Sequence, residues 1–438
     1  MTTARLAIFG TTFDCDCQRR HSIQPGTIVY ADDALEKLPE VCRAVAAGPC
    51  AAVLMDRRTR QVGGLATAAS LAMSGMRARP IVVPDKDGDS PVCDEATKAA
   101  LAKRIGRSDV LVAAGGGTIN DLAKWLAFEA GIPYVAVATA ASMNGYTSAN
   151  VAATVAGVKM LLRARPPAAV LARPTVLAEA PYELTAAGLG DVLAKSVSSA
   201  DWRLNYLLFG DYYCRRSVEL ISDVEPLYLR DPAALARREP DALAALFDAL
   251  LLTGAAMTMA ETSAPASGGE HLVSHTLDMM SAAEGRPHDL HGRQVGVATV
   301  LACELYRRAM AIDSPRLSWP APEADAAFWG PLTDAVAKQY AAKAPRIAMA
   351  GDLLPCRSSW QELRRQIIPM LRPPQQVRDC LAAAGAACSA EDIGCDRPRL
   401  AAALRHAHEA RSRFTILDLA WLVGILPAAA DEIVQQWA

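Results

Sequence analysis

Four of the seven histidines in this 438-residue chain, His271, His275, His288 and His291, lie in one short region. His271 and His275 are four residues apart in a segment with helical spacing, so both side chains project from one face. His291 follows after a loop that contains a glycine and a proline. Neutral imidazoles from separate elements suit Zn²⁺ and similar ions. By itself the clustering leaves two equal interpretations, a metal site and histidines of ordinary structural use.

A metal site would need a third ligand, and a carboxylate with apolar neighbours is the natural candidate. The stretch "TAAGLGDVLAK" supplies Asp191, directly after a glycine and at the predicted start of a helix. Two histidines and one carboxylate leave a coordination position open, which makes the bound metal a Lewis acid. Taken alone, an aspartate at this place is better explained as an ordinary N-cap.

Three glycines follow a predicted buried strand in "VLVAAGGGTINDLAK". Glycines between a strand and a helix let backbone N–H groups approach a phosphate closely, at the positive end of the helix dipole. The run Gly115 to Gly117, followed by Thr118, is neither the GxGxxG fingerprint nor the Gly-Lys-Ser/Thr of a Walker loop. A phosphate cradle and a tight structural turn are both open.

Asp56 ends the apolar run "AAVLMD". An acidic side chain at the end of a strand can bind a ribose hydroxyl and repel a 2′-phosphate, which would favour NAD over NADP. A turn or helix N-cap is the commoner explanation for an isolated aspartate at such a place.

The two parts of the chain differ in their pattern. Up to Ala180, short apolar runs alternate with helical stretches, which is typical of a parallel sheet covered by helices on both faces. From Pro181 onward, Ala/Leu/Arg/Glu-rich helical segments dominate. We expect an α/β nucleotide-binding domain over 1–178 and an all-α domain over 179–438. The predicted strands are 26–31, 51–56, 79–84, 109–118 and 133–139.

Composition excludes several classes of function. A net charge of −2 with scattered Lys and Arg leaves no basic face for nucleic acid. The apolar run 242–260 is long enough for a membrane span, but its alanines and Asp248 favour a buried core helix without membrane insertion. Eleven dispersed cysteines favour a reducing cytoplasm over a disulfide framework. Cys15 and Cys17 would suit a soft metal, but two thiols without further partners are more often ordinary.

Five motifs follow one another along the chain: GGGTINDLAK, TAASMNG, GLGDVLAK with ADWR, SGGEHLVSH and LHGRQVGVAT. In this order they resemble the sn-glycerol-1-phosphate dehydrogenases, which belong to the iron-containing alcohol dehydrogenase and dehydroquinate synthase superfamily. The likeness extends to RSRFTILDLAWLVGIL near the C-terminus. It implies a dehydroquinate synthase-like fold, with an α/β NAD(P)-binding domain followed by a helical domain for metal and substrate. It also implies a cytoplasmic homodimer active in phospholipid metabolism.

The resemblance assigns roles to particular residues. It places one divalent metal on Asp191, His271 and His291, with zinc favoured and nickel or iron as alternatives. His275 becomes a proton relay or a support for the ligands. Lys195, one turn after Asp191, either meets a substrate phosphate or is a solvated lysine at a helix end. The implied contacts to NAD(H) or NADP(H) are Asp56, Gly115, Gly116, Gly117, Thr118, Asp121, Thr139 and Ser142.

The activity implied is the interconversion of dihydroxyacetone phosphate, a small phosphorylated substrate, and sn-glycerol 1-phosphate. The metal would polarise the carbonyl group and NAD(P)H would deliver hydride to it. Alternatives are a dehydrogenase of another polyol, phosphate or phosphonate, a sugar-phosphate cyclase of the dehydroquinate synthase type, and a non-catalytic homologue. The cyclases generally place Glu at the first ligand position, where this chain has Asp191.

Three residues depart from the family pattern. Asn144 stands at a catalytic position in place of the usual Asp of S-x-D-G, and an amide cannot accept a proton as a carboxylate does. Arg173 and Arg293 stand where an acidic or small residue is usual. These changes make their surroundings more positive, which either suits a more anionic substrate or reflects drift at the surface.

Overall fold

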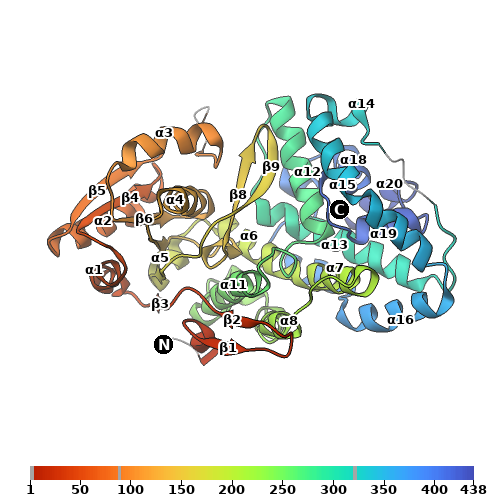
Figure 1. Cartoon of the computed structure of the whole chain (residues 1–438), viewed down its shortest axis with the longest axis horizontal. Helices are drawn as coiled ribbons and strands as arrows, with labels where there is room; N and C mark the ends of the chain where they lie inside the picture. Colours follow the sequence, from red (N-terminus) through yellow and green to blue (C-terminus); the bar gives the residue numbers. More distant parts are fainter. Residues whose placement is uncertain (1–3, 87–89, 319–322) are drawn as a thin grey trace. The chain divides into compact units, whose positions relative to one another are not determined.

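The computed structural model describes residues 4–86, 90–318 and 323–438 (Figure 1). In space the chain forms two compact units. Unit 1 comprises Met1–Gly188 and Glu219–Thr262, and unit 2 comprises Leu189–Val218 and Ser263–Ala438. The chain therefore enters unit 2, returns to unit 1 and leaves it again. The expected division into a domain over 1–178 and a domain over 179–438 stays a prediction.

Unit 1 is built on a six-stranded sheet in the order β3-β10-β7-β6-β4-β5, in which every neighbouring pair is parallel. The central strands β6 and β7 are buried along their whole length, because helices cover both faces of such a sheet. All five predicted strands are confirmed, with shifted bounds. The strands are β3 (Thr27–Tyr30), β4 (Cys50–Met55), β5 (Arg77–Val82), β6 (Val110–Gly115), β7 (Tyr134–Ala138) and β10 (Ala169–Ala172).

The sequence analysis missed β10, which lies between β3 and β7 in the sheet. Its four residues follow two prolines and are half alanine, so the run lacks the β-branched character by which strands are usually predicted. Two antiparallel hairpins were missed as well. They are β1 (Thr12–Asp14) with β2 (Arg20–Ser22), and β8 (Asn150–Val155) with β9 (Val158–Arg163).

Helices of unit 1 begin and end where the sequence supplies caps. The Asp94 side chain accepts a hydrogen bond from the Thr97 N–H at the start of α3, and Gly131 ends α4 in the left-handed region at φ 68°. Leu38 of α1 and Leu71 of α2 pack into the same core as the strands. The helices are α1 (Ala34–Val45), α2 (Leu65–Met73), α3 (Glu95–Ile105), α4 (Gly117–Ala130), α5 (Pro174–Glu179), α9 (Glu225–Leu229), α10 (Ala233–Ala236) and α11 (Pro240–Ala260).

Helix α11 is long and apolar enough to cross a membrane by length and composition, but 83% of its most apolar window is buried inside the protein. Phe247 of this helix stacks on Tyr30 of β3, with 5.7 Å between ring centroids. The Thr147 hydroxyl donates a hydrogen bond to the Leu251 carbonyl oxygen at 2.6 Å. The helix thus serves as a core element of unit 1, as its alanines and Asp248 predict.

Within the described residues, unit 2 contains helices and no strand, which confirms the helical C-terminal region. Helix α13 is buried over most of its 21 residues. Its neighbours include α12, α17, α19 and α20. The helices wholly or partly in this unit are α6 (Tyr182–Leu193), α7 (Lys195–Phe209), α8 (Arg215–Ser222), α12 (Gly269–Glu284), α13 (His291–Ala311), α14 (Ala326–Trp329), α15 (Thr333–Leu353), α16 (Arg357–Ile367), α17 (Pro374–Ala383), α18 (Arg397–His406), α19 (Ile416–Leu422) and α20 (Ala430–Trp437).

Candidate metal site and glycine turn

Unit 2 brings Asp191, His271 and His291 together from α6, α12 and α13. One ligand atom from each residue lies within 4.8 Å of the other two. Nε2 of His271 is 3.6 Å from Oδ1 of Asp191, and the two imidazole centroids are 5.1 Å apart. A carboxylate and two imidazoles at this spacing are a donor set for a divalent ion. The residues therefore fit the metal that the sequence predicts.

Asp191 lies in the last turn of α6, so its predicted place at the start of a helix is wrong. Gly190, the residue before Asp191, is required here because its Cα packs closely against α13. A Cβ at Gly190 would lie 2.0 Å from the Gly292 carbonyl oxygen and 3.2 Å from Gly296 Cα. Only glycine lets α6 approach the first turn of α13 this closely. That approach sets the Asp191 carboxylate beside His291, the first residue of α13.

Lys195 is buried at the start of α7, so the alternative of a solvated lysine is wrong. Its Nζ lies 4.0 Å from Oδ1 of Asp191 and donates a hydrogen bond to the Ala266 carbonyl oxygen at 3.2 Å. Burial alone would raise the pKa of the Asp191 carboxyl, but the Lys195 ammonium and His271 outweigh it and lower the pKa to about 2. Burial lowers the pKa of Lys195 against the opposing pull of Asp191. The carboxylate is therefore held ionised.

Glu270 orients His271. It belongs to the motif SGGEHLVSH but was not among the predicted site residues. Its Oε1 lies 2.7 Å from His271 Nδ1 and accepts the Gly268 N–H at 2.8 Å. A carboxylate on Nδ1 fixes the tautomer in which Nε2 faces the ligand position. Burial opposes protonation of His271, but the hydrogen bonds to Asp191 and Glu270 prevail and raise its pKa. Ser274 plays the corresponding part for His291, with Oγ 3.1 Å from Nδ1.

Asp201, from the "ADWR" motif, anchors the helix that carries the histidines. Its Oδ2 accepts the N–H of Gly269, the first residue of α12, at 2.7 Å. Its Oδ1 accepts the Ile416 N–H at 2.7 Å and the Tyr306 hydroxyl at 2.5 Å. Burial, and next the Glu270 carboxylate, raise the pKa of Asp201 to about 8. One side chain thus ties the N-terminus of α12 to α13 and α19.

His275 lies one turn after His271, buried, and its ring stacks on that of His291 with 5.4 Å between centroids. Arg411 Nη2 donates to His275 Nδ1 at 3.4 Å. Arg413 donates to the Ser267 carbonyl oxygen at 2.7 Å. Burial, with the Arg413 charge, lowers the pKa of Arg411 to about 10. Both arginines belong to the C-terminal motif RSRFTILDLAWLVGIL, where their spacing gives no sign of a place beside the histidines.

His288 and the two unusual arginines lie in other surroundings. His288 is exposed, with Nδ1 3.2 Å from an Asp278 carboxylate oxygen. Arg293 forms an ion pair with Asp289 at 2.7 Å and donates to the Asp392 carbonyl oxygen. In unit 1, Arg173 Nε donates to the Asp32 carbonyl oxygen at 3.2 Å. Each arginine therefore has a local structural partner.

The glycine turn of unit 1 joins β6 to α4. A Cβ at Gly115 would lie 2.7 Å from Ile119 Cβ, so the return of the helix onto the strand requires glycine there. Gly116 differs, because its φ of −85° and ψ of −158° suit any residue and a Cβ would meet nothing within 4 Å. The fold does not demand glycine at 116, but a group bound close to the backbone would. Gly117 and Thr118 begin the helix, whose first N–H groups suit a diphosphate.

The other predicted nucleotide contacts also lie in unit 1. Asp56 follows β4, and its Oδ1 accepts the N–H groups of Arg58 and Thr59, each at 2.7 Å. This is the turn role described for an isolated aspartate, and the ribose contact stays a prediction. Asp121 ties α4 to β8 by accepting the Ala152 N–H at 3.1 Å.

Thr139, Ser142 and Asn144 lie on the connection that follows β7. Thr139 lines a small pocket together with Arg173, Gly63 and residues at the ends of β7 and β10. Asn144 begins a short 3-10 helix, Asn144–Tyr146. The three residues thus belong to the same unit as the glycine turn, whereas the predicted catalytic residues His275 and Lys195 belong to unit 2.

Comparison with known proteins first defines the class. Residues 29–181 match the family described as iron-containing alcohol dehydrogenase. A probable glycerol dehydrogenase from Sinorhizobium meliloti superposes with a TM-score of 0.60 at 18% identity, over 94% of this chain and 98% of that chain. The fold is thus that of the iron-containing alcohol dehydrogenases.

Two relatives narrow the class to one family, and both are named glycerol-1-phosphate dehydrogenase (NAD(P)+). The protein from Geobacillus stearothermophilus is 31% identical over 77% of this chain and 78% of its own length. The protein from Bacillus velezensis is 29% identical over 93% of this chain and 94% of its own length. The chain belongs to the glycerol-1-phosphate dehydrogenase family.

Proposed function

We propose that this chain is an NAD(P)H-dependent dehydrogenase that interconverts dihydroxyacetone phosphate and sn-glycerol 1-phosphate. The observation that carries the proposal is the Asp191, His271 and His291 set, whose first two members are buried and whose third is half-buried. Glu270 orients His271, and the buried Lys195 lies beside Asp191. The names of the relatives favour this reaction over a cyclase or a non-catalytic role.

Asp191, His271 and His291 would hold the metal, and we propose zinc, which accepts carboxylate and imidazole ligands. When bound, such a metal supplies Lewis-acid polarisation of the substrate carbonyl, and NAD(P)H supplies hydride. The chain keeps the ligands ready for this role. Lys195 holds the carboxylate ionised, and Glu270 keeps the Nδ1 proton of His271 engaged so that Nε2 faces Asp191.

His275 is placed to move the proton of the reaction. A guanidinium only donates hydrogen bonds, so the contact with Arg411 makes Nδ1 of His275 the acceptor. The neutral ring then carries its proton on Nε2. We assign Nε2 as a proton relay between the substrate oxygen and water: in reduction it passes its proton to the oxygen of the product alcohol as it takes another from water, and in the reverse direction it gives its proton to water as it takes the proton of the alcohol.

Positive charge on one buried and two half-buried side chains suits a phosphorylated substrate. Lys195, Arg411 and Arg413 are held in unit 2 near the ligand residues or His275. Lys195 and Arg413 already engage Asp191 and Ser267, so Arg411 is our first candidate for the substrate phosphate. A planar guanidinium binds phosphate oxygens in pairs.

The nucleotide would lie against the glycine turn, with its diphosphate at Gly116 and the start of α4. Asp56 directly follows β4, where its carboxylate would accept a ribose hydroxyl and repel a 2′-phosphate. We therefore propose that NADH is preferred over NADPH. Asp56→Ser should reduce that preference while leaving metal content unchanged.

The test combines elemental analysis with kinetics on one preparation. Wild type, His271→Ala and His288→Ala would be compared for bound metal and for oxidation of NADH and NADPH with dihydroxyacetone phosphate. His288 is the matched control, since it lies in the same region but is exposed and outside the ligand set. We expect the His271 variant to lose metal at this site and at least about a thousandfold in activity. The His288 variant should keep both.

Three results would separate the parts of the proposal. Metal bound through His271 without turnover of dihydroxyacetone phosphate would overturn the substrate and keep the site, and Asn144 would be examined first. In the reverse direction, oxidation of sn-glycerol 3-phosphate in place of the 1-phosphate would overturn the stereochemistry. Metal content unaffected by His271→Ala would overturn the site itself.

We further propose a cytoplasmic homodimer. The compartment is supported by eleven cysteines that are thiols in the structure, and the dimer by the family resemblance. Light scattering of the purified protein tests the oligomeric state, and a monomer at working concentration would contradict it.

A further inference from the structure

The N-terminal hairpin of unit 1 holds a second group of metal-type side chains. Its strands β1 and β2 have three residues each and pair Phe13 with His21. Between them, the Cys15 N–H donates to the Arg19 carbonyl oxygen at 3.0 Å. Gln18 takes up the left-handed region, at φ 64°, which turns the chain back within a few residues. The loop "CDCQ" is thus a tight knuckle that presents two thiols.

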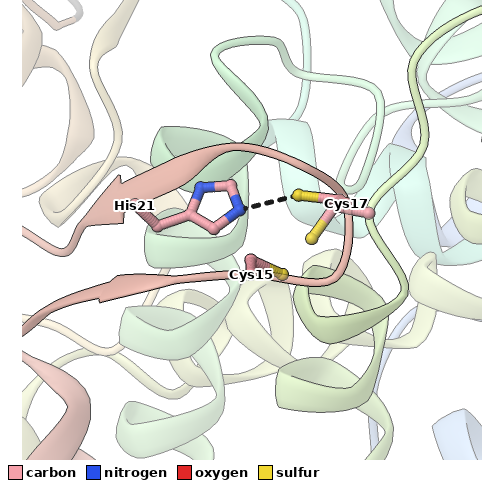
Figure 2. Close-up of side chains that lie close together, drawn as sticks. Cys15, Cys17 and His21 are labelled. Atoms are coloured by element: carbon pink, nitrogen blue, oxygen red, sulfur yellow. Dashed lines mark hydrogen bonds between the residues drawn. The ribbon is translucent and has the colours of Figure 1, made fainter.

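Both thiols lie beside a buried imidazole, as Figure 2 shows. Cys17 Sγ is 3.1 Å from His21 Nε2, and the ligand atoms of Cys15, Cys17 and His21 all lie within 4.8 Å of one another. Zn–S and Zn–N bonds of about 2.3 and 2.0 Å put tetrahedral ligand atoms roughly 3.5–3.8 Å apart. The sulfur–nitrogen distance of 3.1 Å is shorter than this, so Cys17 Sγ and His21 Nε2 would move slightly apart around an ion. The three ligand atoms are already gathered closely enough that only small side-chain shifts are needed.

Burial and chain length point the same way. His21 is only 4% exposed although it lies on a three-residue strand whose neighbours Arg20 and Ser22 are exposed. A two-stranded hairpin this short is marginal by itself in water. It continues through Ile23, fully buried, into β3 at the edge of the six-stranded sheet. Ligand bonds from these side chains to one metal ion would hold the hairpin closed and so fix the position at which β3 begins.

We propose that Cys15, Cys17 and His21 bind a structural zinc ion, separate from the metal of Asp191, His271 and His291. The ion clamps the knuckle and holds the hairpin against the start of the sheet. Two thiolates and one imidazole leave one position of the tetrahedron to a further donor. Binding releases the thiol protons to solvent and involves no redox change.

Cobalt spectroscopy on the full chain separates the two sites. Thiolate ligands give Co²⁺ strong charge-transfer bands in the near ultraviolet, and the Asp191 set contains no sulfur. Protein stripped of metal under reducing conditions would be titrated with Co²⁺ in wild type, His271→Ala and Cys15→Ser/Cys17→Ser. The matched control is Cys50→Ser/Cys388→Ser, because these two cysteines are also half-buried.

We expect the thiolate bands in wild type, in His271→Ala and in the control, with band intensity reporting the number of sulfur ligands. Cys15→Ser/Cys17→Ser should lose the bands and bind one equivalent fewer than wild type. Absent bands in reduced wild type would overturn the proposal. So would bands that persist in the double variant.

Proteolysis of wild type supplies a test that needs no variant. Arg19 and Arg20 are exposed on the knuckle and are sites for trypsin. Zinc-loaded protein should be cut there at least about tenfold more slowly than stripped protein, since binding stabilises the closed hairpin. Mass spectrometry of the N-terminal fragment assigns the cut. Equal rates with and without zinc would overturn the structural role.

Discussion

The candidate metal site of unit 2 and the glycine turn of unit 1 differ in what would hold a ligand: charged side chains in the first, and backbone N–H groups in the second. Around Asp191 and His271, charged side chains are buried and each is held by another, as Lys195 and Glu270 show. At Gly116 the important feature is a missing side chain and an uncapped helix start. The first site depends on residues that touch no ligand, whereas the second depends on backbone that must remain accessible. Substitutions should therefore act differently in the two regions.

Among substitutions that leave the three ligands in place, the largest effect should come from Glu270→Gln, which tests whether the orientation of His271 matters for metal binding. The amide lacks the charge that holds the Nδ1 proton of His271, so we expect about a 10- to 100-fold loss of metal affinity. Competition with a chromophoric chelator measures the dissociation constant. The matched control is Glu284→Gln on the same helix, which is exposed.

An unchanged affinity in Glu270→Gln would mean that the ligands need no orienting group, and the contrast between the regions would fail. Thermal unfolding of the metal-free proteins should accompany the titration. A loss of stability alone would lower the melting temperature without changing the dissociation constant of the folded protein. The two measurements therefore separate orientation from folding.

Gly116→Val tests the opposite principle in unit 1. The backbone at 116 suits valine and a Cβ meets nothing within 4 Å, so the variant should fold and keep its metal. Its side chain would occupy the space of the diphosphate. We expect KM for NADH to rise about tenfold, the loss of one charge-assisted hydrogen bond. Thr118→Val, in the first turn of α4, serves as a comparison because it places the same side chain two residues further along without adding bulk.

A KM unaffected by Gly116→Val would show that the glycine turn is structural, the alternative that the sequence left open. A loss of metal in the same variant would also contradict the contrast, because the change lies in unit 1 and the ligands lie in unit 2. Fluorescence titration with NADH checks the kinetic result against binding. It needs no turnover.

Sequence patterns predict much of this fold because its strands and helices obey local rules. The fully apolar runs around β4, β6 and β7 indicate a parallel sheet, and Gly131 marks the end of α4. β10 escapes prediction because it is only four residues long and half alanine, so it carries little local preference for a strand. Its place between β3 and β7 is set by tertiary packing. Motif order identified the family, which periodicity alone does not.

The residues of the candidate site also fall into those that local sequence spacing reveals and those that it does not. His271, His275 and His291 are conspicuous by type and spacing, and their proximity agrees with the sequence analysis. Asp201 and Arg411 reach the site from distant segments, and nothing in local spacing reveals such contacts. His21 beside Cys17 could have been found, since a histidine four residues after a CxC pair is a readable signal.

Asp201→Asn tests the buried charges of unit 2 through pH. Burial and Glu270 raise the pKa of Asp201 from 3.8 to about 8, so between these values the folded protein keeps a proton that the unfolded chain loses. Its contribution to the free energy of unfolding is full below pH 3.8, falls as pH rises and is gone above about pH 8. The variant should lack this decline, on the order of 1 kcal/mol per pH unit.

Urea unfolding at pH 6 and pH 8 measures the difference in slope, with the exposed Asp334→Asn as control. Asparagine will lower stability at both pH values, since it replaces an acceptor of three hydrogen bonds. The slope is therefore the quantity that decides. Equal slopes in wild type and Asp201→Asn would show that the anchor of α12 stays ionised.

The smallest effect should come from Arg293→Gln, which tests whether Arg293 contributes to substrate binding in unit 2. Arg293 is next but one to His291, yet its guanidinium turns to Asp289 and the Asp392 carbonyl oxygen. Such a partly exposed pair contributes at most about 1 kcal/mol to stability. We expect kcat and KM for dihydroxyacetone phosphate to change by less than about twofold. A large rise in KM would place Arg293 among the phosphate-binding cations, and the departure at this position would then tune the substrate.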